Sequence, residues 1–172
     1  MNGRMNHSSA LVLPSLFCAL FPFASSLQGC GQGCTEIGCI DQLDILIQAA
    51  DGSERSYDAT LLIDGEEITC PAPELDSTGA CTDARVSVAL WELTDCEETR
   101  TKDSVSQSCT PNGKYMQWLT IEDTPEEVHV VLSSADFPTV ESTFTPKYSS
   151  SRPNGKHCPP QCHQATETWT VD

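Results

Sequence analysis

Four side chains that commonly bind transition metals lie close together near the end of the chain: His157, Cys158, Cys162 and His163. Two imidazoles and two thiolates form a donor set that zinc or copper accepts. Structural zinc sites, however, usually take their ligand pairs from separated elements, and oxidation of the two cysteines would remove both thiolates. We therefore expect a disulfide role for this loop and keep a zinc or copper site as the alternative.

The arrangements that catalysis usually needs are missing from the sequence. It contains no Gly-x-Ser-x-Gly, His-Glu-x-x-His, phosphate-binding loop or Cys-x-x-Cys motif. His129 lies in an alternating stretch and is expected to face outward from a sheet. The 25 acidic residues are too many for one carboxylate pair to stand out. We predict a protein that is not an enzyme, with no catalytic residue and no cofactor.

The first residues have the layout of a secretory signal peptide. Arg4 gives the N-terminal end a positive charge, and an apolar run from Ala10 to Ala24 follows. This run is shorter than the roughly 20 residues that span a bilayer as a helix, and Pro14 and Pro22 interrupt it. We expect residues 1–29 to be a cleaved signal rather than a transmembrane helix.

The sequence Leu27-Gln28-Gly29-Cys30 follows the apolar run and resembles the lipobox of bacterial lipoproteins. The resemblance implies that Cys30 is acylated, becomes the new N-terminus and holds the protein on a bacterial membrane through its acyl chains. Gly31 stands where an Asp is associated with inner-membrane retention, so we expect the outer membrane, on its periplasmic or surface face. The alternative is a secreted soluble protein that is cleaved near Ser25 to Gly29 and keeps Cys30 for a disulfide.

The number of cysteines agrees with lipidation. Cys18 lies in the leader, and acylation of Cys30 leaves eight of the ten cysteines, which can pair completely. Cysteine at this density indicates an exported protein, because disulfides persist in oxidising compartments. The disulfide candidates are Cys34, Cys39, Cys70, Cys81, Cys96, Cys109, Cys158 and Cys162. Two polar stretches are bracketed by Cys70 and Cys81 and by Cys96 and Cys109, so we expect these two pairs to close loops.

Composition limits both size and partners. The part of the chain after residue 29 suits a single domain, and we expect a flexible tether over 30–40 and one β domain over 41–172. The formal net charge of −16 repels nucleic acid and anionic membrane surfaces. Nucleic acid is therefore excluded as a partner, and a protein or glycan partner is expected.

Short alternating segments predict the strands of this domain. Residues 42–50 alternate with a period of two, and Asp64-Gly65 predicts a hairpin between 57–63 and 66–70 in which Leu61 faces Ile68. Further strands are expected at 85–93, 115–122, 127–133, 139–148 and 164–171, with 115–122 and 127–133 forming a second hairpin. Seven or eight short strands predict an all-β, two-layer antiparallel, immunoglobulin-like sandwich stapled by disulfides; a small β-barrel is the alternative.

The C-terminal part resembles the end of uncharacterised secreted lipoproteins that are abundant in myxobacteria. The residues that carry the resemblance are Tyr148, Pro153, Asn154, Gly155, Cys158, Cys162, Gln164 and Ala165. Membership of that family would imply a location in the cell envelope and a fold, but no activity. We therefore expect a non-catalytic, lipid-anchored envelope or surface protein with a binding or structural role; the alternative is a metal-binding envelope protein that uses His157, Cys158, Cys162 and His163.

Overall fold

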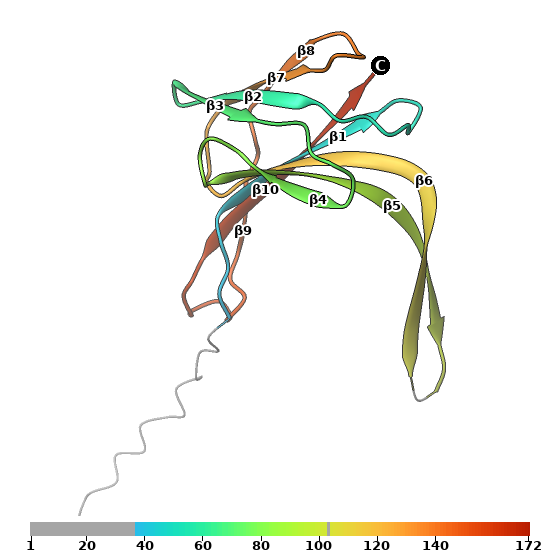
Figure 1. Ribbon diagram of the computed structural model, residues 1–172. Coiled ribbons are helices and arrows are strands. Elements are labelled where there is room, and N and C mark those ends of the chain that lie inside the picture. Colours follow the sequence, from blue (N-terminus) through green and yellow to red (C-terminus); the bar gives the residue numbers. More distant parts are fainter. Residues whose placement is uncertain (1–36, 103) are drawn as a thin grey trace, which may run out of the picture. The chain divides into compact units, whose positions relative to one another are not determined.

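The computed structural model describes residues 37–102 and 104–172, which form two β-sheets and no helix (Figure 1). Contacts divide the chain into 1–33 and 34–172, and the described residues belong to the second unit. The all-β, two-layer fold is confirmed, with ten described strands rather than seven or eight. The described part of the chain includes no helix with the length and apolar composition that crossing a bilayer requires.

The larger sheet has six strands and contains both ends of the domain. In spatial order they are β4 (Ser77–Ala80), β5 (Val86–Arg100), β6 (Val105–Ile121), β1 (Gln42–Ala49), β10 (Cys162–Val171) and β9 (Ser149–Ser151). β1 and β10 pair in parallel, with Leu46 opposite Thr168. The first and last strands of the domain are therefore neighbours, and this sheet is mixed rather than wholly antiparallel.

The smaller sheet has four strands. Its order is β3 (Glu66–Cys70), β2 (Asp58–Ile63), β7 (Val128–Ser133) and β8 (Val140–Phe144). The predicted hairpin is confirmed in its register, because Leu61 pairs with Ile68 and Ala59 with Cys70. Asp64 and Gly65 have φ angles of 51° and 86°, the left-handed values that a two-residue hairpin turn requires.

The predicted second hairpin is wrong. β6 pairs with β1 and β5 in the larger sheet, whereas β7 pairs with β2 and β8 in the smaller one. Residues 122–127 therefore carry the chain from one sheet to the other. Both segments are strands, as predicted, but a two-residue period indicates only which face of a strand is buried and does not specify its partner strand.

The core lies between the two sheets and is built from alternate residues of their strands. Leu43, Ile45, Leu61, Leu119 and Leu132 are fully buried there. Burial of side chains of this size contributes roughly 1.5–3 kcal/mol each. The core also holds one fully buried amide, Gln117, which accepts a hydrogen bond from Tyr57 N (2.8 Å) and donates one to Tyr57 O (2.9 Å). Tyr57 immediately precedes β2, so this amide joins the two sheets.

The stretch between Cys96 and Cys109 is a hairpin and not the loop that its polar composition suggested. β5 and β6 remain paired out to Arg100 and Val105, beyond a register shift between Glu92 and Thr94. The described residues from Thr94 to Pro111, which we name the arm, are all exposed. Polar side chains are compatible with a paired ladder here, because both faces of the arm contact solvent. Figure 1 shows the arm extending beyond the body of the larger sheet.

Oxidised cysteines connect several of these elements. The predicted pairs Cys70–Cys81 and Cys96–Cys109 are confirmed. A third disulfide joins Cys39 to Cys162 across 123 positions of the sequence, and Cys158 is also disulfide-bonded. The remaining cysteines of the prediction, Cys30 and Cys34, lie outside the described residues together with the signal peptide and the lipobox.

Candidate functional site

The loop between β9 and β10, residues 152–161, carries most of the chemically notable residues, and its centre is Asn154. The Asn154 side chain accepts a hydrogen bond from Ile37 N (3.0 Å) and donates to Ile37 O (3.0 Å) and Pro159 O (2.6 Å). Gly155, with φ of 102°, adopts a left-handed turn that few other residues tolerate. Asn154 therefore holds the first described residue of the chain against this loop.

His163 at the start of β10 makes a second connection to the same N-terminal segment. Its backbone N–H donates to Asp41 Oδ1 (2.7 Å), and its ring Nδ1 lies 3.3 Å from the same oxygen. Ring Nε2 lies 3.4 Å from Gln161 Nε2. Arg152 binds Gln161 Oε1 and donates to Lys156 O (2.5 Å). The side chains of Arg152, Gln161 and His163 are therefore all hydrogen-bonded within the fold.

We name this set of contacts the N-terminal clamp: the disulfide Cys39–Cys162, the Asn154–Ile37 hydrogen bonds and the Asp41–His163 pair. Asn154, Cys162 and His163 stand out in the sequence, but Ile37 and Asp41, their partners in the clamp, do not. The Asn-Gly pair indicated a turn. No sequence signal indicated that the Asn side chain bonds a backbone more than a hundred residues away.

The predicted disulfide role of the C-terminal loop is confirmed. Cys162 is buried and bonded to Cys39, Cys158 is disulfide-bonded, His157 is exposed, and His163 contacts Asp41. Neither sulfur is a thiolate in the oxidised protein. Within 37–102 and 104–172, no group of three or more His, Cys, Asp and Glu residues is placed to hold a metal ion. A metal site at these four residues stays a prediction that concerns the reduced chain.

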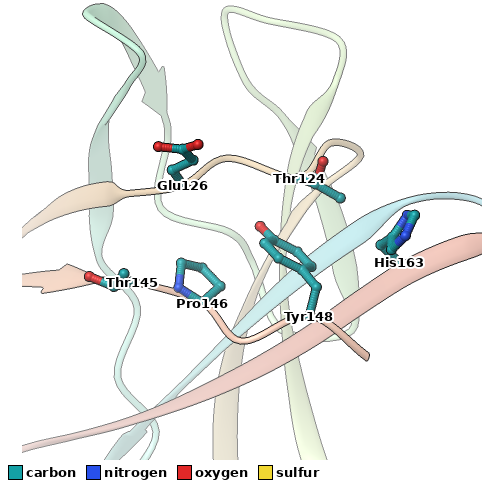
Figure 2. Close-up of a pocket in the computed structure, with 6 residues that line it drawn as sticks. All are labelled: Thr124, Glu126, Thr145, Pro146, Tyr148 and His163. Atoms are coloured by element: carbon teal, nitrogen blue, oxygen red, sulfur yellow. The ribbon is translucent and has the colours of Figure 1, made fainter. Parts of the chain in front are cut away.

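A shallow cleft of about 500 Å³ lies beside the clamp (Figure 2). It is lined by Thr124, Glu126, Thr145, Pro146, Tyr148 and His163. The Tyr148 hydroxyl donates to Pro125 O (3.0 Å), and burial raises the pKa of Tyr148 to about 12. Tyr148 is therefore uncharged near neutral pH and its proton is committed to the backbone. The imidazole of His163 lies within hydrogen-bond distance of Asp41 and Gln161.

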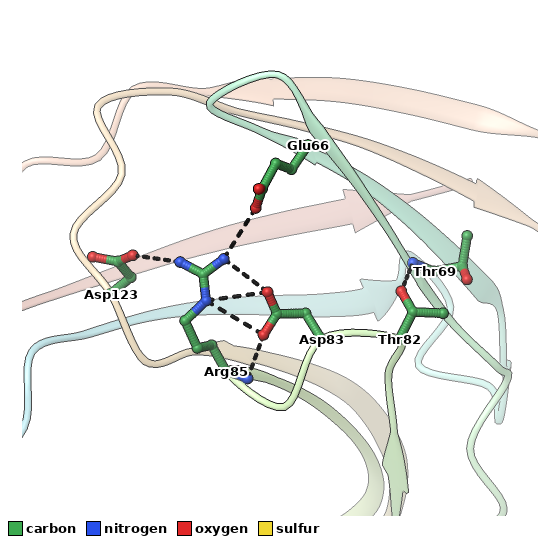
Figure 3. Close-up of polar contacts among 6 residues, drawn as sticks. All are labelled: Glu66, Thr69, Thr82, Asp83, Arg85 and Asp123. Atoms are coloured by element: carbon green, nitrogen blue, oxygen red, sulfur yellow. Dashed lines mark hydrogen bonds and ion pairs between the residues drawn. The ribbon is translucent and has the colours of Figure 1, made fainter.

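A cluster of charged residues joins the two sheets at another place (Figure 3). The Arg85 guanidinium lies 2.7 Å from Asp83, 3.0 Å from Asp123 and 3.3 Å from Glu66. The hydrogen bonds from Arg85 hold the pKa of Asp83 below its usual value. Nearby, Thr69 N donates to Thr82 Oγ1 (3.0 Å). Three carboxylates surround one partly exposed cation, so this cluster has no positive charge to offer to an anionic ligand and contributes little to stability.

Comparison with models of protein families, with curated proteins and with solved structures finds no match for this chain. Its function is therefore argued from the residues themselves. Within the described residues, the loop 152–161 contacts the N-terminal segment of the same chain, through the hydrogen bonds between Asn154 and Ile37.

Proposed function

We propose that this protein is a non-catalytic, lipid-anchored protein of the bacterial cell envelope that presents its β domain for binding. Residues 1–29 direct export, and Cys30 carries the acyl chains that hold the protein on the outer membrane. The observation that carries the proposal is the disulfide Cys39–Cys162, which bonds the domain covalently to the segment that follows the anchor.

The N-terminal clamp suits a chain that is held at its N-terminal end. Tension applied at residue 30 would reach the domain through Ile37 and Cys39. Because Cys39 is bonded to Cys162, this tension passes into β10 as well as into β1, and the parallel pairing of the two strands shares it. Asn154 and His163 add hydrogen bonds at the same place. The first strand is thus protected from being peeled away from the sheet.

The oxidised cysteines support export. Three disulfides join described residues and Cys158 is disulfide-bonded as well, a state that a reducing cytosol does not maintain.

The anchor is tested by intact-mass measurement of protein isolated from membranes, with and without reductant. We expect a mature chain that begins at Cys30 and carries two or more acyl chains, because each buried methylene contributes roughly 0.8 kcal/mol and one chain holds only marginally. Cys30→Ser should abolish acylation. Cys18→Ser, in the leader, is the matched control and should leave it unchanged. An unmodified Cys30 in the wild-type protein would refute the anchor.

A further inference from the structure

The larger sheet has an outer face, which we define as its side directed away from the four-stranded sheet, and this face carries two tryptophans. Trp91 and Trp118 are 40% and 38% exposed, although their strand neighbours Leu90 and Leu119 are buried in the core. Trp118 pairs with Ala89 on β5 and with Leu46 on β1. Two of the three tryptophans of the chain are thus presented to solvent from adjacent strands.

The two indoles are close enough to act together. Trp91 pairs with Met116, which is two positions before Trp118, so the tryptophans are diagonal neighbours on one face. Diagonal neighbours lie within reach of aromatic side chains. Ala89 is only 9% exposed even though it faces outward, so larger neighbours cover it. Two exposed indoles on neighbouring strands of one sheet face are apolar groups of the kind found at interaction sites.

Neutral polar groups border the tryptophans. Thr166, Thr168 and Thr170 form an exposed row of hydroxyls on β10, and Thr168 lies opposite Leu46. On the adjoining strands, Asp44 accepts hydrogen bonds from Thr120 Oγ1 (3.0 Å) and from the Gln42 amide. These border residues therefore offer hydroxyl groups as hydrogen-bond donors and acceptors. The Asp44 carboxylate already accepts hydrogen bonds from Thr120 and Gln42.

The charge of this face selects its partner. By the same alternation, the ionised side chains of this face near the tryptophans are Asp44 on β1 and Lys114, two positions before Met116 on β6, so the face carries one charge of each sign in a chain whose net charge is −16. The surrounding field repels anionic ligands. A cationic partner would find a single carboxylate that is already hydrogen-bonded twice. The complementary ligand is therefore uncharged, with apolar surface for the indoles and hydroxyls for the threonines.

The arm adds a boundary. Figure 1 shows β5 and β6 bending away from the four-stranded sheet as they lead into the arm. The arm therefore lies on the same side of the larger sheet as the outer face. The pairing of β5 with β6 shifts register between Glu92 and Thr94, directly after Trp91. An extended ligand bound along the tryptophans would thus contact the arm at one end of the outer face.

We propose that the outer face binds a neutral polysaccharide. A pyranose ring presents C–H groups on its faces, which stack on an indole, and hydroxyls around its edge, which hydrogen-bond to side chains such as those of Thr168 and Thr170. The inference rests on the proposed function, since it names the ligand class and the site through which the anchored domain binds.

The test is affinity electrophoresis of the mature protein in detergent, with xyloglucan, galactomannan, arabinoxylan and β-glucan as separate probes. At least one probe should retard the wild type and change its tryptophan fluorescence. Trp91→Thr and Trp118→Thr should each weaken this binding at least tenfold, because the strand-favouring threonine keeps the sheet and removes the stacking surface. Trp169→Phe, which alters the inward-facing tryptophan packed on Phe144, is the matched control and should bind like the wild type.

Three results would overturn the proposal: no retardation by any probe, unchanged binding by both tryptophan variants, or self-association in sedimentation experiments that both variants abolish. The third result would make the outer face an interface between two copies. Acylation is measured separately on the same preparations. An acylated protein that binds no probe refutes the polysaccharide site alone, whereas an unacylated protein that binds refutes the anchor alone.

Discussion

The side-chain amide of Asn154 hydrogen-bonds to both backbone polar groups of Ile37, 117 positions earlier in the chain. It pairs with this residue as a neighbouring β-strand would. Together with Cys39–Cys162, it holds the N-terminal segment of the domain against the C-terminal loop. The loop that looked most like a ligand site in the sequence is thus bonded to the segment through which the proposed anchor would pull.

Asn154→Asp tests this contact with little change in size. The carboxylate keeps an acceptor for Ile37 N but loses the donor to Ile37 O and Pro159 O, and it places a negative charge beside both carbonyls. We expect a local loss of about 1 kcal/mol, seen as faster amide hydrogen exchange in residues 37–40. Asn112→Asp removes a similar amide donor at the base of the arm and should leave this exchange unchanged. Equal exchange in wild type and Asn154→Asp would contradict the role of Asn154.

Gln117→Leu tests the amide that joins the sheets. Gln117 is 1% exposed, and the substitution leaves Tyr57 N and Tyr57 O without their partner. Urea unfolding should show a loss of about 1–3 kcal/mol in the free energy of unfolding, the cost of unsatisfied buried polar groups. Gln107→Leu in the exposed arm is the matched control and should change it by less than about 0.5 kcal/mol. The idea fails if both variants are equally stable.

The disulfides should differ in what they contribute. Cys39–Cys162 closes a loop of 123 positions and Cys70–Cys81 one of 11. In a background that carries Cys158→Ser, which removes the other disulfide at this end of the domain, chain entropy predicts stabilisation of about 5 kcal/mol for the first and about 3 kcal/mol for the second. Replacing each pair by serines and measuring chemical unfolding should therefore show the larger loss for Cys39→Ser with Cys162→Ser. The reverse order would show that loop closure is not the dominant effect.

Tyr148 should make the protein less stable in alkali. Below pH 10 its hydroxyl is protonated in both the folded and the unfolded state, whereas between pH 10 and about 12 only the unfolded state ionises. The unfolded state then binds fewer protons, so the free energy of unfolding falls as pH rises through this window. Tyr148→Phe should reduce the slope, although it loses the bond to Pro125 O at every pH. Unfolding measured at several pH values decides this, and an unchanged slope would contradict it.

Local patterns predicted the parts of the fold that depend on local geometry. The alternation of 42–50 identified β1 with its inward residues, and Asp64-Gly65 identified both the β2–β3 hairpin and its register. A two-residue turn leaves only one pairing that brings Leu61 and Ile68 to the same face. The pairs Cys70–Cys81 and Cys96–Cys109 could be predicted for a related reason, since each closes a short segment.

The predicted strand pairing was wrong where distant segments of the chain compete for the same partner strand. β6 has the alternation of a hairpin strand, yet it pairs with β1, and β7 pairs with β2 in the other sheet. The polar stretch after Leu93 was expected to be a loop because its side chains cannot form a core. It is an arm because cross-strand pairing and the Cys96–Cys109 bond need no core.

The sequence by itself determined which side chains each strand buries, where the hairpin turns and which short cysteine pairs close, because these properties follow from backbone period, turn conformation and chain separation over a few residues. Tertiary structure alone decided that β1 pairs in parallel with β10, that Asn154 bonds Ile37 and that Trp91 and Trp118 share a face. These relationships depend on which distant segments pack together, and that choice is made by the burial of the whole core rather than by any single stretch of the chain.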